Sequence, residues 1–236
     1  YLLRLYIHAS LKQGLRCLLH EKPFLGVNGS GKHNNWSVIT DTNVNLFKPG
    51  SNPSENIPFL ATLACVIRGV DLYADLLRLS IAGAGNDHRL GGHEAPPAII
   101  SMFLGSDLDQ VIEAVVENKK INGRVKNRFQ TGVKVIPDFA KDTTDRNRTS
   151  PFAFTGNKFE FRGVGSSQSI ATVNTMLNTI LASQMNVMSD ELEKGKDIKD
   201  IIKDFLSIFF SMFICYSCSY SSCCRICSFY WCWSCF

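Results

Sequence analysis

The segment FAFTGNKFEFRGV, residues 152–164, constrains the fold of this chain more than any other stretch. Phenylalanines alternate with other residues on both sides of Thr-Gly-Asn, which is the pattern of two strands joined by a glycine-containing turn. A period of two places Phe159 and Phe161 on one face, and Glu160 and Arg162 on the other. We therefore predict a β-hairpin with one apolar face and one polar face.

Helical periodicity accompanies this strand signal. Apolar residues from Ile57 to Ile81 recur at steps of three and four, which predicts one long helix that ends at the GAGND sequence. A second helix is expected after Ser106 as its N-cap. A third spans 167–195, and its inner stripe is Ile170, Val173, Leu177 and either Ile180 or Leu181. The fold class is therefore α+β, with an antiparallel sheet and the helices 57–81 and 167–195 packed on one face.

The stretch GVNGSGKHNNWS, residues 26–37, is nearly a phosphate-binding P-loop. A P-loop requires Ser or Thr after the lysine as a Mg²⁺ ligand, and His33 stands there instead. The residues that follow, 34–47, alternate between apolar and polar with a turn near 41–43, and their apolar set is Trp36, Val38, Val44 and Leu46. A P-loop lysine opens a helix, not a strand, so we do not interpret this stretch as a P-loop. Further short strands are expected at 14–20, 97–104 and 132–137.

Charge and cysteine usage narrow the class of protein. The net charge of +4 over 236 residues is too small to indicate nucleic-acid binding, and the basic residues in 119–128 suit a solvated connection. Only Cys17 and Cys65 of the nine cysteines precede residue 215, both in apolar runs typical of buried thiols. We expect a reduced, cytoplasmic protein without a signal peptide.

Composition changes abruptly at about residue 205. The stretch 205–236 is rich in Phe, Ser and Cys and carries little charge after Phe205. We favour the interpretation that it is non-native translated sequence, such as a frameshift product, and divide the chain into 1–204 and 205–236. A membrane or interfacial segment is less favoured because Ser and Cys dilute the apolar run. A metal or disulfide module is a third alternative.

Polar residues that suit chemistry gather in four places: 28–37, 86–98, 142–154 and 157–163. Each has an ordinary structural explanation by itself, such as a loop histidine or a surface ion pair. Together, the imidazole of His33 and the carboxylate of Glu160 suit Mg²⁺ or Mn²⁺. Nearby arginines supply planar donors for carboxylates and phosphates. This combination is what phosphoryl transfer requires.

Four motifs in order resemble the glutamine synthetases, in the form typical of the type III enzymes. They are VNGSGKHNNWS, NDHRLGGHEAPPA, DTTDRNRTSPFAFTGNKFEFR and GSSQSIA, and the resemblance covers roughly residues 12–200. It implies a segment of the family's catalytic domain. It also implies that ATP phosphorylates the side-chain carboxylate of glutamate, and that ammonia then displaces phosphate from γ-glutamyl phosphate to form glutamine.

The resemblance implies a role for each matching residue. The implied ligands of Mg²⁺ (or Mn²⁺) are His33 and Glu160. The implied glutamate contacts are Asn28, Gly29, Arg89 and Arg162. The implied nucleotide contacts are Asn35, Ser37, Arg148 and Lys158. The implied catalytic residues are Glu94, which closes the site and helps to deprotonate ammonium, Arg89, and Arg148 on phosphate.

Departures from the family pattern limit this expectation. Asn35 stands where more familiar families have a second histidine, and Ala153 where they have a second arginine. The family's upstream glutamate-bearing strands and the N-terminal domain that closes the pocket of a neighbouring subunit have no counterpart before residue 12.

We expect a homo-oligomer for the full-length protein and negligible turnover from this chain alone. One alternative is a non-catalytic remnant that binds ligand or partner subunits. The other is a membrane-tethered protein, which we consider unlikely.

Overall fold

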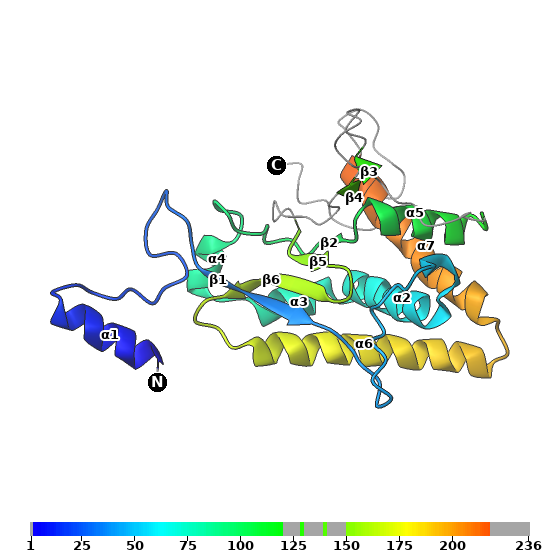
Figure 1. Cartoon of the computed structure of the whole chain (residues 1–236), viewed down its shortest axis with the longest axis horizontal. Helices are drawn as coiled ribbons and strands as arrows, with labels where there is room; N and C mark the ends of the chain where they lie inside the picture. The colour runs from blue at the N-terminus through cyan, green and yellow to red at the C-terminus, as the bar shows by residue number, and fades with distance from the viewer. Residues whose placement is uncertain (1, 120–127, 130–138, 141–149, 218–236) are drawn as a thin grey trace.

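The computed structural model describes residues 2–119, 128–129, 139–140 and 150–217 (Figure 1). The helices are α1 (Leu2–Lys12), η1 (Pro53–Glu55), α2 (Ile57–Leu72), α3 (Ala74–Ser80), α4 (Ala84–Arg89), α5 (Ser106–Val116), α6 (Ile170–Glu193) and α7 (Ile198–Ser217). The strands are β1 (Gly31–Trp36), β2 (Met102–Phe103), β3 (Arg128–Phe129), β4 (Phe139–Ala140), β5 (Phe152–Phe154) and β6 (Phe159–Gly165).

The expected hairpin is confirmed, and it forms the centre of a four-stranded sheet in the order β1-β6-β5-β2. Strands β5 and β6 are antiparallel, with Phe152 opposite Phe161 and Phe154 opposite Phe159. Strand β1 pairs antiparallel with the other edge of β6. The α+β class is therefore confirmed.

The expectation of a wholly antiparallel sheet is wrong, because β2 pairs with β5 in parallel. Helix α5 lies between these two strands in the chain. Such a crossover returns the chain to the same end of the sheet, which produces parallel neighbours. The predicted strand at 97–104 is accordingly reduced to Met102–Phe103, and the strand expected at 132–137 lies outside the described residues.

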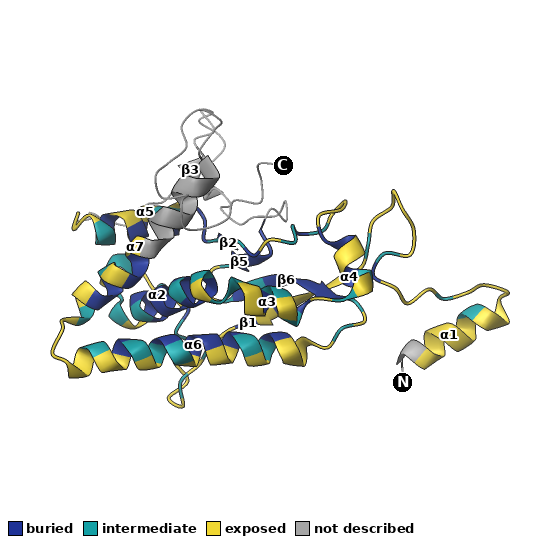
Figure 2. Ribbon diagram, turned by 180° about the vertical axis from the view of Figure 1, so that it is seen from behind, coloured by how far each residue is buried: buried dark blue, intermediate teal, exposed yellow. Residues whose placement is uncertain are grey.

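An aromatic cluster fills the buried side of the sheet. The rings of Phe152 and Phe159 stack at 4.7 Å, and Phe47 meets Phe159 edge-on at 5.1 Å. Trp36 lies 5.1 Å from Phe47. Aromatic pairs at these separations add to the stabilisation from burial. Figure 2 shows this interior as a band of buried residues between the exposed outer surfaces of the helices.

Helix α6 lies along this buried side, and two of its asparagines bind β1. Asn34 donates to Asn174 at 2.8 Å, and the indole of Trp36 donates to Asn178 at 2.9 Å. Because each buried polar group has a partner, β1 faces the helix without an unsatisfied donor. The alternate residues of β1, including His33 and Asn35, are exposed on the opposite side.

The single helix predicted for 57–81 is in fact two helices. Helix α2 ends at Leu72, and α3 follows at a bend of 78°. Tyr73 between them has φ −126° and ψ 30°, which is outside the helical range. The bend keeps Leu77 and Ile81 buried as α3 turns along α6. Apolar spacing could not reveal the break, because both halves keep the same period.

Other local predictions need correction. Residues 14–20 form no strand, and the GAGND sequence at 83–87, expected only to end a helix, lies mostly within α4. Gly105, not Ser106, precedes α5, and it makes no side-chain cap. Val44 and Ile170 are exposed rather than buried: Val44 lies outside any helix or strand, and Ile170 is the first residue of α6.

Helix α7 runs through the compositional change at residue 205. Ile201, Ile202, Phe205 and Leu206 are all buried in the same core as α2 and α6. The ring of Phe205 also lies 4.5 Å from the guanidinium carbon of Arg68 on α2, a cation–π contact. The first residues after 204 therefore contribute to the folded core.

Among the described residues, no single helix has the length and apolar character needed to span a membrane. Helices α2 and α3 reach that length and character only together, across their 78° bend.

Candidate functional site

A β-bulge between β1 and β6 shapes the exposed side of the sheet. Lys32 pairs with Val164 and Asn34 with Phe161, so His33 alone stands opposite Arg162 and Gly163. A bulge of this kind turns side chains away from the regular alternation. It lets β6 bury both Phe161 and Val164 on the helix side while Glu160 and Arg162 belong to the other face.

His33, Glu160 and Arg162 form a connected polar row on that face, in which His33 is exposed, Glu160 is half-buried and Arg162 is buried. His33 Nδ1 lies 2.6 Å from Glu160 Oε1, and Arg162 Nε donates to Glu160 Oε2 at 3.0 Å. Burial of the Glu160 carboxyl raises its pKa, but the hydrogen bonds from Arg162 and His33 outweigh burial and hold the pKa below its usual value. The row therefore presents an ionised carboxylate beside an imidazole.

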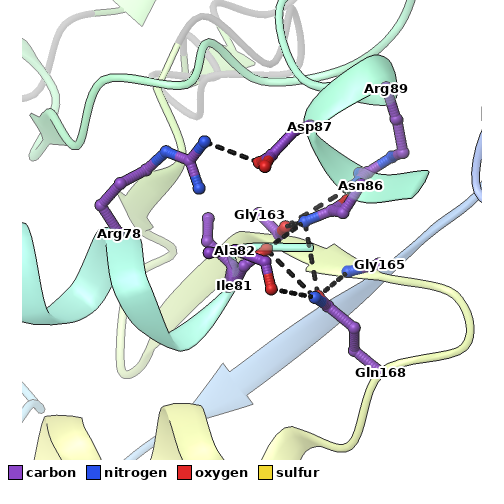
Figure 3. Close-up of polar contacts among 9 residues, drawn as sticks. All are labelled: Arg78, Ile81, Ala82, Asn86, Asp87, Arg89, Gly163, Gly165 and Gln168. Carbon is purple, nitrogen blue, oxygen red and sulfur yellow. Dashed lines mark hydrogen bonds and ion pairs between the residues drawn. The ribbon is translucent and has the colours of Figure 1, made fainter. Parts of the chain in front are cut away.

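Arg89 lies beneath the glycine-rich loop rather than on the surface. Its side chain is 4% exposed, and NH1 donates to Asn86 Oδ1 at 2.9 Å while NH2 donates to the Arg162 carbonyl at 3.1 Å. Asn86 in turn donates to the carbonyls of Ile81 and Gly163, both at 2.8 Å (Figure 3). Helix α4 is thus fastened to the bulge of β6 through Arg89 and Asn86.

The glycines of the loop allow this arrangement. A Cβ atom on Gly29 would lie 2.6 Å from the Glu21 carbonyl and 2.8 Å from Arg89 Cγ, and one on Gly31 would overlap the Arg89 guanidinium. Real Cβ atoms do not approach so closely, so the loop passes over Arg89 only with glycine at both positions.

Asn28 and Glu94 connect the glycine-rich loop before β1 to the loop that follows α4. Asn28 Nδ2 donates to Glu94 Oε2 at 2.9 Å, although 66 residues separate them. Glu94 has φ 54°, a left-handed conformation that few non-glycine residues adopt. Its loop is closed by a 2.9 Å bond from the Gly91 amide to the Pro96 carbonyl. The structure therefore brings together two residues that sequence motifs placed far apart.

Ser37 directly follows the other end of β1. Ser37 Oγ donates to Asn45 Oδ1 at 3.3 Å and to the Asn157 carbonyl at 3.4 Å. Lys158 follows Asn157 in the hairpin turn, so its backbone is at the same end of β1 as Ser37. Asn35 pairs with Glu160 across the strands. This end is therefore continuous with the His33–Glu160 pair.

Glu21 was not identified from the sequence. It is 6% exposed, and its carboxylate accepts a 3.1 Å bond from the Ser167 amide and another from the Ser167 hydroxyl. A single glutamate in an irregular segment carries no periodic signal of burial, so only the tertiary structure could reveal it.

Comparison with known proteins gives a consistent result. The chain is 55% identical over 185 residues to the type-3 glutamine synthetase of Dictyostelium discoideum, a match that covers 78% of this chain and 25% of that protein. It is 52% identical over 197 residues to a glutamine synthetase of Butyrivibrio fibrisolvens and 51% identical over 186 residues to one of Bacteroides fragilis. These matches cover 28% and 26% of the two bacterial proteins. This chain belongs to the glutamine synthetase family.

The chain spans about a quarter of the length of the curated glutamine synthetases that it matches. No family model matches it. The expected site residues of the glutamine synthetase resemblance lie within the described residues, except Arg148, which falls in the stretch 141–149 outside them.

The glutamine synthetase family implies ATP and a divalent metal, and the expected metal ligands can be compared with the described residues. An imidazole nitrogen and an ionised carboxylate, 2.6 Å apart, are suitable donors for Mg²⁺ or Mn²⁺. However, no group of three or more His, Cys, Asp or Glu side chains that could hold a metal exists within the described part of the chain. The pair does not form a metal site by itself, and its Nδ1 and Oε1 atoms are bonded to each other.

Proposed function

We propose that this chain is part of a glutamate–ammonia ligase that makes glutamine from glutamate, ammonium and ATP through γ-glutamyl phosphate. The observation that carries the proposal is the order of polar residues along the exposed face of β1. Asn28 and Gly29 precede the strand, His33 lies in its middle beside Glu160 of the adjacent strand β6, and Ser37 follows it. Because a strand rises about 3.3 Å per residue, this face is long enough for two ligands to meet over the central pair.

The first end suits an amino-acid substrate. Asn28 and Gly29 offer amide and backbone groups, and Arg162 offers a guanidinium suited to a carboxylate. Arg89 is proposed as a further glutamate contact on the resemblance alone. Its guanidinium is buried and bonded to Asn86 and to β6, so it would have to turn out from the base of the loop to reach a substrate. Glu94 is tied to Asn28, which supports a role in closing this end and in accepting a proton from ammonium.

The second end suits the nucleotide. Ser37, Asn35 and Lys158 gather there, and Lys158 would supply positive charge to phosphate. Arg148 is proposed to stabilise the transferred phosphoryl group. A divalent cation bound by His33, Glu160 and ligands from elsewhere would neutralise phosphate charge. The chain's own task is to align the glutamate carboxylate with the γ-phosphate, since phosphoryl transfer depends mainly on positioning and electrostatics.

The chain by itself is proposed to have negligible turnover. The described residues contain no group of three or more side chains that could hold a metal, and the chain spans only about a quarter of the length of its relatives. These observations also support the second candidate function, a non-catalytic segment that binds ligand or partner subunits. Homo-oligomerisation and a cytoplasmic setting are part of the proposal, and the described cysteines, Cys17 and Cys65, are both free thiols.

The test is to measure glutamine formation with Mg²⁺ by two proteins: the chain as given, and the product of its complete coding sequence. We expect activity from the second and none from the first. His33→Ala in the second should lower kcat by about 100-fold or more, the loss seen when an electrostatic contact to the transition state is removed. Lys199→Ala, at the start of α7, is the control. Absence of glutamine from the complete product would refute the proposal.

A further inference from the structure

Glu21 is a buried carboxylate at the base of the glycine-rich loop. Its carbonyl accepts a 2.8 Å bond from the Ser30 amide. This bond closes the segment between them, which contains Asn28 and Gly29, into a compact loop whose ends touch. Whatever holds Glu21 in place therefore also holds the base of that loop.

The Glu21 side chain fastens the loop to the turn between β6 and α6. Its Oε1 accepts from the Ser167 amide at 3.1 Å and from the Ser167 hydroxyl. The Ser166 amide donates to the Ser30 carbonyl at 3.3 Å, so both ends of the loop are bound to the same turn. The turn directly follows the strand that carries Glu160 and Arg162.

Two glycines let the neighbouring elements close around this carboxylate. A Cβ atom on Gly85 of α4 would lie 2.6 Å from Glu21 Oε2, and one on Gly165 of β6 would lie 2.8 Å from Glu21 Cγ. Glu21 therefore contacts α4, which carries Arg89, and β6, which carries Arg162. The loop, the helix and the strand that form the proposed glutamate end all meet at this side chain.

The carboxylate is ionised at neutral pH. Burial raises its pKa, but the hydrogen bonds from Ser167 outweigh burial and hold the pKa below the usual value. Hydrogen bonds to an ionised acceptor are stronger than neutral ones, and a neutral glutamine at this position would bind the turn more weakly.

We infer that Glu21 is a positioning residue for the glutamate end of the site: it holds Asn28 and Gly29 against α4 and β6 without touching the substrate. The inference rests on the proposed function for its kinetic consequences. A residue that only stabilised the fold would affect glutamate and ATP binding alike. A residue that positions this loop should affect glutamate binding and leave ATP binding unchanged. The proposed nucleotide contacts, Ser37 and Lys158, lie at the opposite end of β1.

The kinetic test compares Glu21→Gln and Ser167→Ala with the unchanged product of the complete coding sequence. We expect the KM for glutamate to rise about tenfold in Glu21→Gln and about threefold in Ser167→Ala, with the KM for ATP changed less than about twofold. Ser167 is exposed, so its variant keeps the test available if Glu21→Gln does not fold. Glu193→Gln, an exposed charge at the end of α6, is the matched control. Equal rises in both KM values, or no rise in either variant, would overturn the inference.

A second measurement does not depend on enzymatic activity. The Ser30 and Ser167 amides are both bonded at Glu21, so their hydrogen exchange reports the attachment directly. We expect exchange at both to accelerate at least about tenfold in Glu21→Gln, while the amide of Leu177 within α6 is unchanged. Unchanged exchange at Ser167 would overturn the inference. If the unchanged protein makes no glutamine, the proposed function fails, and this measurement still decides the role of Glu21.

Discussion

The guanidinium of Arg89 lies directly against Gly31, so closely that a side chain at position 31 would overlap it. Arg89 is itself held by Asn86 and by the carbonyl of Arg162. The first residue of β1 and the last residue of α4 are therefore packed as a unit, and the glycine-rich loop is shaped by an arginine beneath it as much as by any ligand above it.

This contact predicts a destabilising effect of Gly31→Ala. Because Arg89 is buried and bonded, it cannot move aside freely, and overpacking of this kind costs about 1–3 kcal/mol. Urea unfolding of the purified protein measures the change. A double-mutant cycle with Arg89→Ala provides the control, since removal of the guanidinium should abolish most of the penalty at Gly31. Equal costs in both backgrounds would show that the contact is unimportant.

The bonds between β1 and α6 predict the effect of a second substitution. Asn174→Ala would leave the amide of Asn34, which is 5% exposed, without its partner. An unpaired buried donor costs about 1–3 kcal/mol, so the free energy of unfolding should fall by that amount. Thr175→Ala on the exposed side of α6 is the matched control. If both variants are equally stable, Asn34 has found another partner or water.

The start of α7 provides a test of the boundary at residue 204. Leu206 is fully buried in the core, so Leu206→Ala should lower the free energy of unfolding by about 2–4 kcal/mol. Ser207→Ala, an exposed neighbour, should have little effect. Thermal unfolding of the two variants distinguishes them. A neutral Leu206→Ala would mean that the segment from 205 onward does not contribute to the core.

The Asp109 carboxyl on α5 predicts a pH dependence. Burial raises its pKa to about 6, and its Oδ1 has no hydrogen-bond partner among the described residues. Since the folded state favours the protonated form, stability is highest below the unfolded pKa and declines as pH rises to about 6, above which the penalty is complete. Asp109→Asn should therefore be more stable than the unchanged protein by about 1–2 kcal/mol at pH 8.

The difference within this pair should shrink as pH falls toward the unfolded pKa of 3.8 and vanish at roughly one unit below it, where Asp109 is neutral in both states. Urea midpoints at several pH values test this, with Glu113→Gln on the exposed side of α5 as the control. A difference that is constant with pH would contradict the prediction.

A structural feature of this chain could be predicted from the sequence when its signal comes from residues that are close together in the chain. The hairpin at 152–164 was predicted because alternation and a glycine turn act between near neighbours. The pairing of His33 with Glu160, which are 127 residues apart, came from resemblance to a family, since no local pattern joins them. The break at Tyr73 was missed because two helices of the same period look like one.

The sequence by itself determined the α+β class, the polar and apolar faces of the hairpin, and the family, because these depend on periodicity and on motifs in order. Only the tertiary structure decided the parallel pairing of β2, the bulge opposite His33, the burial of Arg89 beneath Gly31, and the place of Glu21. Each of these depends on which distant segments meet and how closely they approach. Such contacts are selected by the packing of the whole core, and no short stretch of sequence contains them.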